Sequence, residues 1–288
     1  MEFIDSALEE FRQKRTGLIS LSGMKLPVGN DVFFRAKQSE LIAQYQGARI
    51  FLSQTGTTAW DYWFTKTEPT GEKTVQLIEN NYRAYFFETA LLYYNIVVDL
   101  SWVMLYSAVE YRCVADGIAV DITGIQTINT AYDALRKLES ITTAPINAKT
   151  SAFQYLKKLY PKCECAVDMV SSFWSKFYDS EIRQLYNFCK HRGKPIYKEI
   201  ADLQGGKPFS IGIFQSPCVE QQQGTSALAF SGSKYQKIVS DTHDVQKKVV
   251  LSEEIERLLK FDNETLYPYI KQLLVEIERI VKPSPLVV

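Results

Sequence analysis

The apolar positions along most of this chain recur at the spacing of an α-helix. From Lys73 to about Cys113 neither glycine nor proline interrupts the pattern, which predicts one long helix or two helices end to end. The run from Ala84 to Tyr111 is long and apolar enough to span a bilayer, but Glu88 and Asp99 lie inside it. A carboxylate near the bilayer centre costs about 2.5 to 3.5 kcal/mol on insertion scales. We therefore expect a buried central helix and no association with a membrane.

Shorter amphipathic helices are predicted on both sides of this central helix. Their ends are marked by capping and stopping residues, notably Ser180 as an N-cap and Gly193 as a stop. Gly47 is a candidate stop for an early helix, and Ser252 and Asn263 are candidate starts for two late helices. The predicted helices cover 5–15, 31–46, 123–140, 149–159, 164–177, 181–192, a segment beginning at 252, and 263–281.

Between residues 196 and 250 the pattern changes to short runs rich in glycine, serine and β-branched residues, which predicts a few strands or a hairpin. The expected fold class is mainly all-α: an up-and-down helical bundle with a long central helix and a small β-prone insertion. The chain divides accordingly into N-terminal helices packing on the core (1–72), a central bundle (73–195), the insertion (196–250) and C-terminal helices that complete the bundle (251–288).

Composition and charge limit the classes of partner. The 33 basic residues balance 33 acidic ones, so no overall field draws the protein to nucleic acid, and any such binding needs a local patch. The five cysteines are an odd number without the spacing of a disulfide framework, and the first fifteen residues carry acids but no apolar segment typical of a signal peptide. We therefore expect a cytoplasmic location.

Polar residues form a narrow stripe along the otherwise apolar central helix. They are separated by 7, 7, 4, 7 and 4 residues, which keeps them on one side of a helix; they are Asn81, Glu88, Asn95, Asp99, Tyr106 and Glu110. One interpretation is the solvent-facing edge of an embedded helix. The other is an inward polar network, whose buried carboxylates would need cationic or hydrogen-bonding partners.

A second polar cluster lies near the end of the predicted helix 181–192. Arg183, Asn187 and His191 follow one another at i, i+4 and i+8, with Lys190 and Arg192 beside the histidine. Cations are favoured in any last helical turn because the exposed carbonyls carry partial negative charge. A histidine that titrates near neutral pH, beside an amide and fixed cations, also suits acid–base chemistry on a phosphate. Both interpretations remain open at this point.

Written as R-x-x-x-N-x-x-K-H-R-G, residues 183–193 resemble the motif region of HEPN-domain proteins. These are helical bundles that bind nucleotides and RNA and are common in prokaryotic defence and toxin systems. The resemblance covers about 73–198. It implies a catalytic site with His191 as general acid or base for attack of a ribose 2′-hydroxyl on its own phosphate, Arg183 or Arg192 holding the phosphate charge, and Asn187 orienting the site.

The resemblance also implies that Lys190 and Arg192 contact phosphate and that Glu88, Asn95 and Asp99 support the site. It implies no metal and no cofactor, and a homodimer that pairs two such motifs. Seven residues lie between Arg183 and His191, more than in typical HEPN ribonucleases, so RNA or nucleotide binding without cleavage is the second possible activity.

The same residues disfavour several other functions. A carboxylate-bridged di-metal bundle needs Glu-x-x-His pairs, and neither His191 nor His243 has a glutamate three residues before it. A phosphate-binding Walker loop is absent from the sequence. The alternative to the HEPN-like hypothesis is a noncatalytic helical module that binds another protein through the C-terminal helix or the β-prone insertion.

Overall fold

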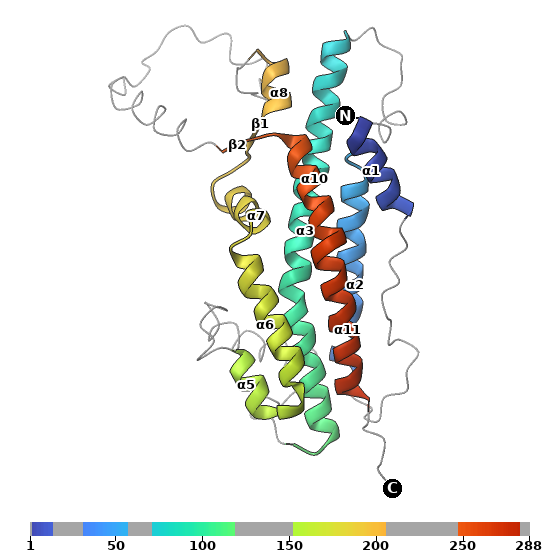
Figure 1. The fold of residues 1–288 in the computed structure, drawn as a ribbon, viewed down its shortest axis with the longest axis vertical. Coiled ribbons are helices and arrows are strands. Elements are labelled where there is room, and N and C mark those ends of the chain that lie inside the picture. Colours follow the sequence, from blue (N-terminus) through green and yellow to red (C-terminus); the bar gives the residue numbers. More distant parts are fainter. Residues whose placement is uncertain (1, 14–30, 57–70, 119–151, 206–246, 283–288) are drawn as a thin grey trace, which may run out of the picture.

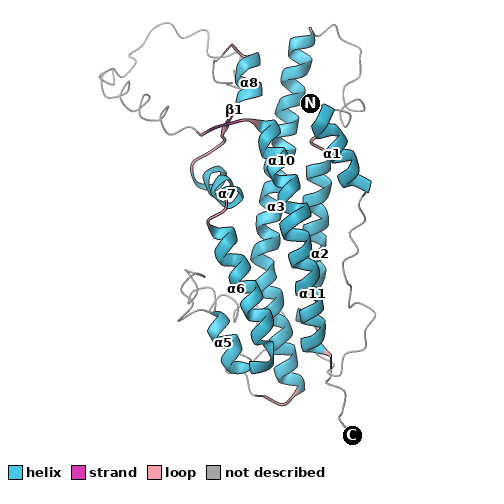
Figure 2. Cartoon of the chain, viewed as in Figure 1, coloured by secondary structure: helices cyan, strands magenta, loops and turns pink. Residues whose placement is uncertain are grey.

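The computed structural model describes residues 2–13, 31–56, 71–118, 152–205 and 247–282. These residues are mainly helical, with two strands of two residues each (Figures 1 and 2). The predicted class, a mainly α-helical bundle around a long central helix, is confirmed. The elements in chain order are α1 (Glu2–Gln13), α2 (Val32–Ser53), α3 (Glu72–Ala115), α5 (Ala152–Leu159), the 3-10 turn η2 (Pro161–Cys163), α6 (Glu164–Tyr178), α7 (Glu181–His191), β1 (Ile196–Tyr197), α8 (Lys198–Leu203), β2 (Lys248–Val249), α10 (Leu251–Phe261), the π-helical segment η4 (Asp262–Leu266) and α11 (Tyr267–Val281).

The central helix α3 matches the long helix predicted from the apolar pattern. Figure 1 shows α2, α6 and α11 running along its length. Every residue from Leu100 to Tyr111 is buried, whereas the first turns at Glu72 are exposed. Within the described ranges α3 is the one helix long and apolar enough to cross a membrane, and 72% of its most apolar window is buried inside the protein.

The prediction that Gly47 ends α2 is wrong, because the helix continues to Ser53. A Cβ atom at Gly47 would lie only 2.8 Å from Cε1 of Tyr93 on α3. The glycine therefore serves close packing between α2 and α3 instead of helix termination. One turn later Phe51 lies against the same ring, with centroids 5.1 Å apart, and Leu52 is fully buried. These contacts hold the helix together past a residue of low helix propensity.

The predicted N-cap at Ser252 is also wrong, since α10 begins at Leu251. The cap comes from Glu199 on α8, whose carboxylate accepts hydrogen bonds from the backbone N–H groups of Leu251 and Ser252, both at 2.9 Å. The hydroxyl of Ser252 donates to the same carboxylate at 3.0 Å. A carboxylate from another element thus satisfies the free N–H groups of the first turn.

No break occurs at Asn263, where a new helix was predicted. The chain passes from α10 through the π-helical segment η4 directly into α11. The first residue of that segment, Asp262, is fully buried and pairs with Arg49 of α2. This tertiary ion pair holds the wider helical turn in place, so a polar residue that resembles a cap in the sequence lies inside a continuous helix.

The ends of the predicted β-prone insertion meet at a short parallel pairing. Ile196 of β1 lies opposite Lys248 of β2, and Tyr197 lies opposite Val249. The strands predicted within 206–246 and the helix predicted at 123–140 lie outside the described residues. The division of the chain into four segments stays a prediction, although side chains of α1, α2, α3, α6, α10 and α11 share one apolar core.

Candidate functional site

Helix α7 carries the predicted site, and its ends are those expected from the sequence. The Ser180 hydroxyl accepts a hydrogen bond from the backbone N–H of Arg183 at 3.2 Å, which confirms the N-cap. The helix ends at His191, and Gly193 follows with φ of 116°, a value that favours glycine. Its buried side chains, Ile182 and Leu185, face the bundle. The polar residues of the motif are thereby placed along the other sides of a short, well-bounded helix.

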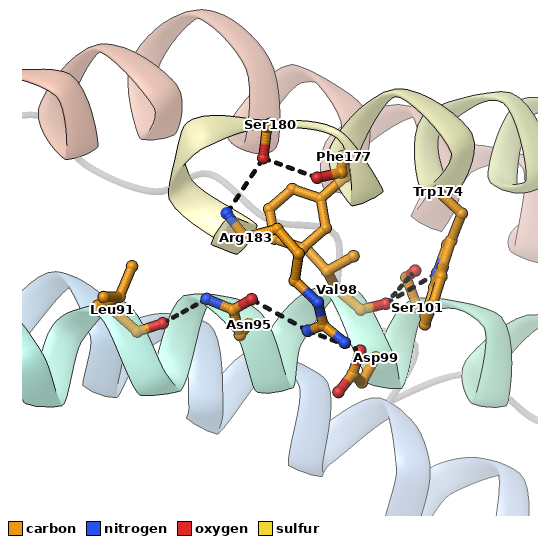
Figure 3. Close-up of polar contacts among 9 residues, drawn as sticks. All are labelled: Leu91, Asn95, Val98, Asp99, Ser101, Trp174, Phe177, Ser180 and Arg183. Carbon is orange, nitrogen blue, oxygen red and sulfur yellow. Dashed lines mark hydrogen bonds and ion pairs between the residues drawn. The ribbon is translucent and has the colours of Figure 1, made fainter. Parts of the chain in front are cut away.

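Arg183 points toward the polar stripe on α3 (Figure 3). Its Nη1 atom donates to Oδ1 of Asn95 at 3.0 Å and lies 3.6 Å from Oδ1 of Asp99. The Asn95 side chain is fully buried, and its amide donates to the backbone carbonyl of Leu91. The guanidinium also lies 5.2 Å from the ring centroid of Tyr186. Arg183 is therefore held by contacts within the protein.

The stripe on α3 is not simply a solvent-facing edge, because Asn95, Tyr106 and Glu110 are all buried. Burial raises the pKa of Glu110 from its ordinary value of 4.5 to about 7. The stripe instead divides into parts with different surroundings. Asn95 and Asp99 contact Arg183, whereas Glu110 lies near the far end of the helix.

Glu88 forms a second link between α3 and the segment after α7. Its Oε1 atom accepts a hydrogen bond from the Tyr197 hydroxyl at 2.9 Å and lies 3.5 Å from Nζ of Lys194. Burial and the Glu88 charge both raise the pKa of Tyr197 far above its ordinary value, so the phenol remains a proton donor. Nζ of Lys194 also lies 3.9 Å from the ring centroid of Tyr85. These contacts fix the position of the residues that follow α7.

The remaining residues of the motif face solvent. Lys190, His191 and Arg192 are exposed and Asn187 is half-buried. Among the residues that the structure describes, none forms a hydrogen bond or ion pair with these four side chains; Lys190 lies 5.9 Å from the ring centroid of Tyr186. At 1.5 Å per residue, Arg183 and His191 are about 12 Å apart along the helix axis. Within one chain the structure does not bring these two side chains together.

A second basic segment, absent from the sequence-based site, lies beside the first. Because β1 pairs with β2, Lys247 and Lys248 are placed next to the chain that follows α7, and the Ile196 N–H donates to the Lys247 carbonyl at 2.9 Å. Lys247 and Lys194 lie close enough to Cys189 of α7 for their charges to lower its pKa, which burial raises to about 11. We call the combined surface the cationic corner; it consists of Lys190, His191, Arg192, Lys194, Lys198, Lys247 and Lys248.

Two acidic residues next to the cationic corner, Glu88 and Glu199, already have partners within the protein. Glu88 accepts from Tyr197 and pairs with Lys194, as described above. Glu199 caps α10: burial would raise its pKa, but the hydrogen bonds from Ser252 and Leu251 lower it below its ordinary value. Residues 190–198 themselves contain four lysines and arginines and no acid. Counted over the described residues, the corner therefore carries an excess of positive charge in a protein with no net charge.

No family model, curated protein or solved structure matches the chain. Within the described part of the chain, no group of three or more histidine, cysteine, aspartate or glutamate side chains could hold a metal ion.

The arrangement favours binding of an anion with several charges. Lysine and arginine side chains from two segments can contact successive phosphates, and the exposed imidazole of His191 lies beside them. Arg183 and the α3 stripe form the support behind this surface. The signal for Lys247 and Lys248 in the sequence is the pair of adjacent lysines before a β-branched run, but nothing in that run indicates its partner strand.

Proposed function

We propose that this protein is a HEPN-like protein that binds the phosphate groups of RNA or of a nucleotide at the cationic corner. The supporting observation is the pairing of β1 with β2, which gathers basic residues from two distant segments while the neighbouring acids are engaged. Binding through such a patch releases counterions from the nucleic acid and weakens as salt rises. Because the chain has zero net charge, attraction of RNA needs a local basic patch, and the cationic corner is such a patch among the described residues.

The proposal includes a metal-independent cleavage step at His191. The imidazole would take the proton of a ribose 2′-hydroxyl, whose oxygen then attacks the adjacent phosphorus as the bond to the 5′-oxygen breaks and that oxygen gains a proton. Arg192 is better placed than Arg183 to hold the developing charge, because Arg183 already contacts Asn95 and Asp99. Asn187 lies one helical turn before His191 and would orient the substrate. A homodimer would bring a second copy of the motif to the same RNA.

Charge reversal tests the binding site. We expect Lys190→Glu combined with Lys248→Glu to weaken binding of a fluorescein-labelled RNA at least tenfold in a fluorescence anisotropy titration, and to flatten its dependence on salt. The matched control reverses Lys158 and Lys162, two exposed lysines on α5 and η2 at the opposite end of the bundle (Figure 1). Equal affinities for parent, test and control variants would contradict the proposal.

Cleavage is tested separately, with a mixed RNA pool in EDTA. The parent is expected to cleave, and His191→Ala is expected to lose cleavage while keeping its circular dichroism spectrum and RNA affinity. Binding without cleavage by the parent would retain the binding site and overturn the ribonuclease step.

The alternative, a protein-interaction module that uses the C-terminal helix, has less support from the packing of α11. Its apolar side chains are already buried in the bundle: Ile270, Leu273, Leu274, Ile277, Ile280 and Val281. Of the insertion, residues 206–246 lie outside the described part, so that route to a protein partner rests on sequence alone.

A further inference from the structure

The side of α3 that faces the cationic corner carries uncovered apolar side chains. Tyr85 and Leu92 are 44% and 41% exposed, although both belong to the central helix of the bundle. At about 100° per residue they share one side of α3 with Glu88, Asn95 and Asp99, the residues that contact Lys194 and Arg183. The polar contacts that position the corner therefore also place these apolar groups at its edge.

Tyr85 is an exposed aromatic ring in contact with a lysine of the corner. Nζ of Lys194 lies 3.9 Å from its centroid, and Glu88 holds that lysine from the next helical turn. The ring thus has an ammonium group against one side and exposed surface beyond it. By contrast, Tyr178 at the end of α6 is 46% exposed, and within the described residues no cation lies over its ring. Exposure alone does not distinguish Tyr85; its combination with the cationic corner does.

Exposed aromatic rings beside a positive groove are the means by which many proteins bind single-stranded nucleic acid. A base stacks on the ring, and neighbouring lysines and arginines contact the phosphates. In a duplex the faces of the bases are already stacked on each other, so no base face is free to stack on such a ring. The Lys194 charge on one side of Tyr85 would add to the attraction between ring and base.

Resting on the proposed function, we propose that Tyr85 is a nucleobase-stacking residue and that the corner binds single-stranded RNA in preference to double-stranded RNA. The phosphates of the strand lie on Lys190, Arg192 and Lys248, and one base lies on the Tyr85 ring. The site thereby recognises a phosphate and a base together, whereas a phosphate chain without bases makes only the phosphate contacts.

The test compares three probes by anisotropy or competition: a labelled single-stranded RNA, the same sequence in a duplex, and inorganic polyphosphate. Tyr85→Ala should weaken single-strand binding about tenfold and leave duplex and polyphosphate binding within twofold of the parent. Tyr85→Trp should keep the single-strand preference, because a larger ring still stacks. Tyr178→Ala is the matched control and should change none of the three.

The outcomes separate this inference from the proposed function. If the parent binds all three probes and Tyr85→Ala weakens none, or weakens all equally, the stacking role is overturned and phosphate binding stands. If the parent binds none of the probes, the proposed function fails and the stacking role fails with it. Unfolding is excluded as the cause of weaker binding when Tyr85→Ala and Tyr85→Trp have the same thermal midpoint and only Tyr85→Trp keeps the single-strand preference.

Discussion

Two arginines in this protein cross between helices to reach an aspartate, and their surroundings differ sharply. Arg49 of α2 contacts Asp262 with 2.5 Å between Nη1 and Oδ2, and the side chains are 12% and 0% exposed. Arg183 of α7 lies 3.6 Å from Asp99, and those side chains are 17% and 46% exposed. The chemical groups are the same, so access of water to the carboxylate is what separates the two pairs.

The buried pair, Arg49 with Asp262, which we call the sealed pair, joins three parts of the bundle. Nη2 of Arg49 donates to the carbonyl of Phe11 at 2.8 Å, and the guanidinium lies 3.8 Å from the Phe11 ring centroid. Tyr45 and Tyr94, both fully buried, flank Asp262. Burial raises the pKa of Asp262, and Arg49 opposes that rise. Because the carboxylate is fully buried and the guanidinium is only 12% exposed, this pair fixes how α1, α2 and η4 pack.

The exposed pair, Arg183 with Asp99, is the weaker of the two. Asp99 is half exposed, so water screens its attraction for Arg183, and most of what holds Arg183 is the hydrogen bond to buried Asn95 and the stacking on Tyr186. Burial therefore separates two roles. The charges buried in the core serve packing, whereas the exposed charges of Lys190 and Arg192 at the end of α7 remain available to an anionic ligand.

Removing the sealed carboxylate should have the largest effect. We expect Asp262→Ala to lower the free energy of unfolding by about 3 to 5 kcal/mol, because it leaves the Arg49 charge buried without its partner. Urea denaturation measures this. The double variant Arg49→Met with Asp262→Leu should recover much of the loss, and exposed Asp179→Ala should change stability little. A loss below about 1 kcal/mol for Asp262→Ala would show that the pair is not sealed.

Glu110 is a buried carboxylate that no arginine contacts among the described residues. Its pKa rises from 4.5 to about 7 in the folded state, so the folded protein keeps a proton that the unfolded chain releases. Stability attributable to this group is therefore full below pH 4.5 and falls as pH rises toward 7, by at most about 3 kcal/mol. Glu110→Gln should match the parent at pH 4.5 and exceed its stability at pH 8. A parallel pH dependence of the two proteins would contradict the buried state of Glu110.

Breaking the exposed pair should cost less. Arg183→Ala is expected to lower the free energy of unfolding by about 1 to 3 kcal/mol, mainly because the buried Asn95 amide oxygen loses its donor. Arg192→Ala, from the exposed corner, should stay within about 0.5 kcal/mol of the parent. Equal losses at the two arginines in a denaturation series would remove the distinction between support and binding surface.

The smallest effect is expected at the link behind the cationic corner. Tyr197→Phe removes the hydroxyl that donates to Glu88 and should lower stability by about 1 kcal/mol, since Lys194 still faces the carboxylate. Tyr178→Phe on the exposed end of α6 is the control and should be neutral. Thermal unfolding at one pH is sufficient to rank the two, and the reverse order would contradict the contact.

The sequence predicts those parts of the fold that local signals determine. The apolar periodicity and the absence of glycine and proline predict α3, and Ser180 with Gly193 predicts both ends of α7. At Gly47 and Asn263 the same rules fail, because a tertiary contact outweighs a local preference. The Tyr93 ring needs the space that Gly47 leaves, and the Arg49 to Asp262 pair carries one helix through into the next.

The candidate site follows the same division. The polar face of α7 is readable from the spacing of Arg183, Asn187 and His191, whereas the contribution of Lys248 is not. Ile196 and Lys248 are 52 residues apart in the chain, and a two-residue parallel pairing leaves no pattern that periodicity can detect. Tyr85 is hidden for a different reason. It is one of 17 tyrosines, most of them at helical spacings typical of a core, and only the fold shows that its ring is uncovered.

The most direct test of the central claim, that the cationic corner is where RNA binds, is photo-cross-linking of the protein to a 4-thiouridine-containing RNA followed by mass spectrometry of the linked peptides. The account predicts links to peptides from the end of α7 through α8, to the peptide that contains Lys248, and to the part of α3 around Tyr85. Links confined instead to α5 and α6, or to the open groove of about 580 Å³ that Glu181, Arg257 and Thr265 line, would contradict it.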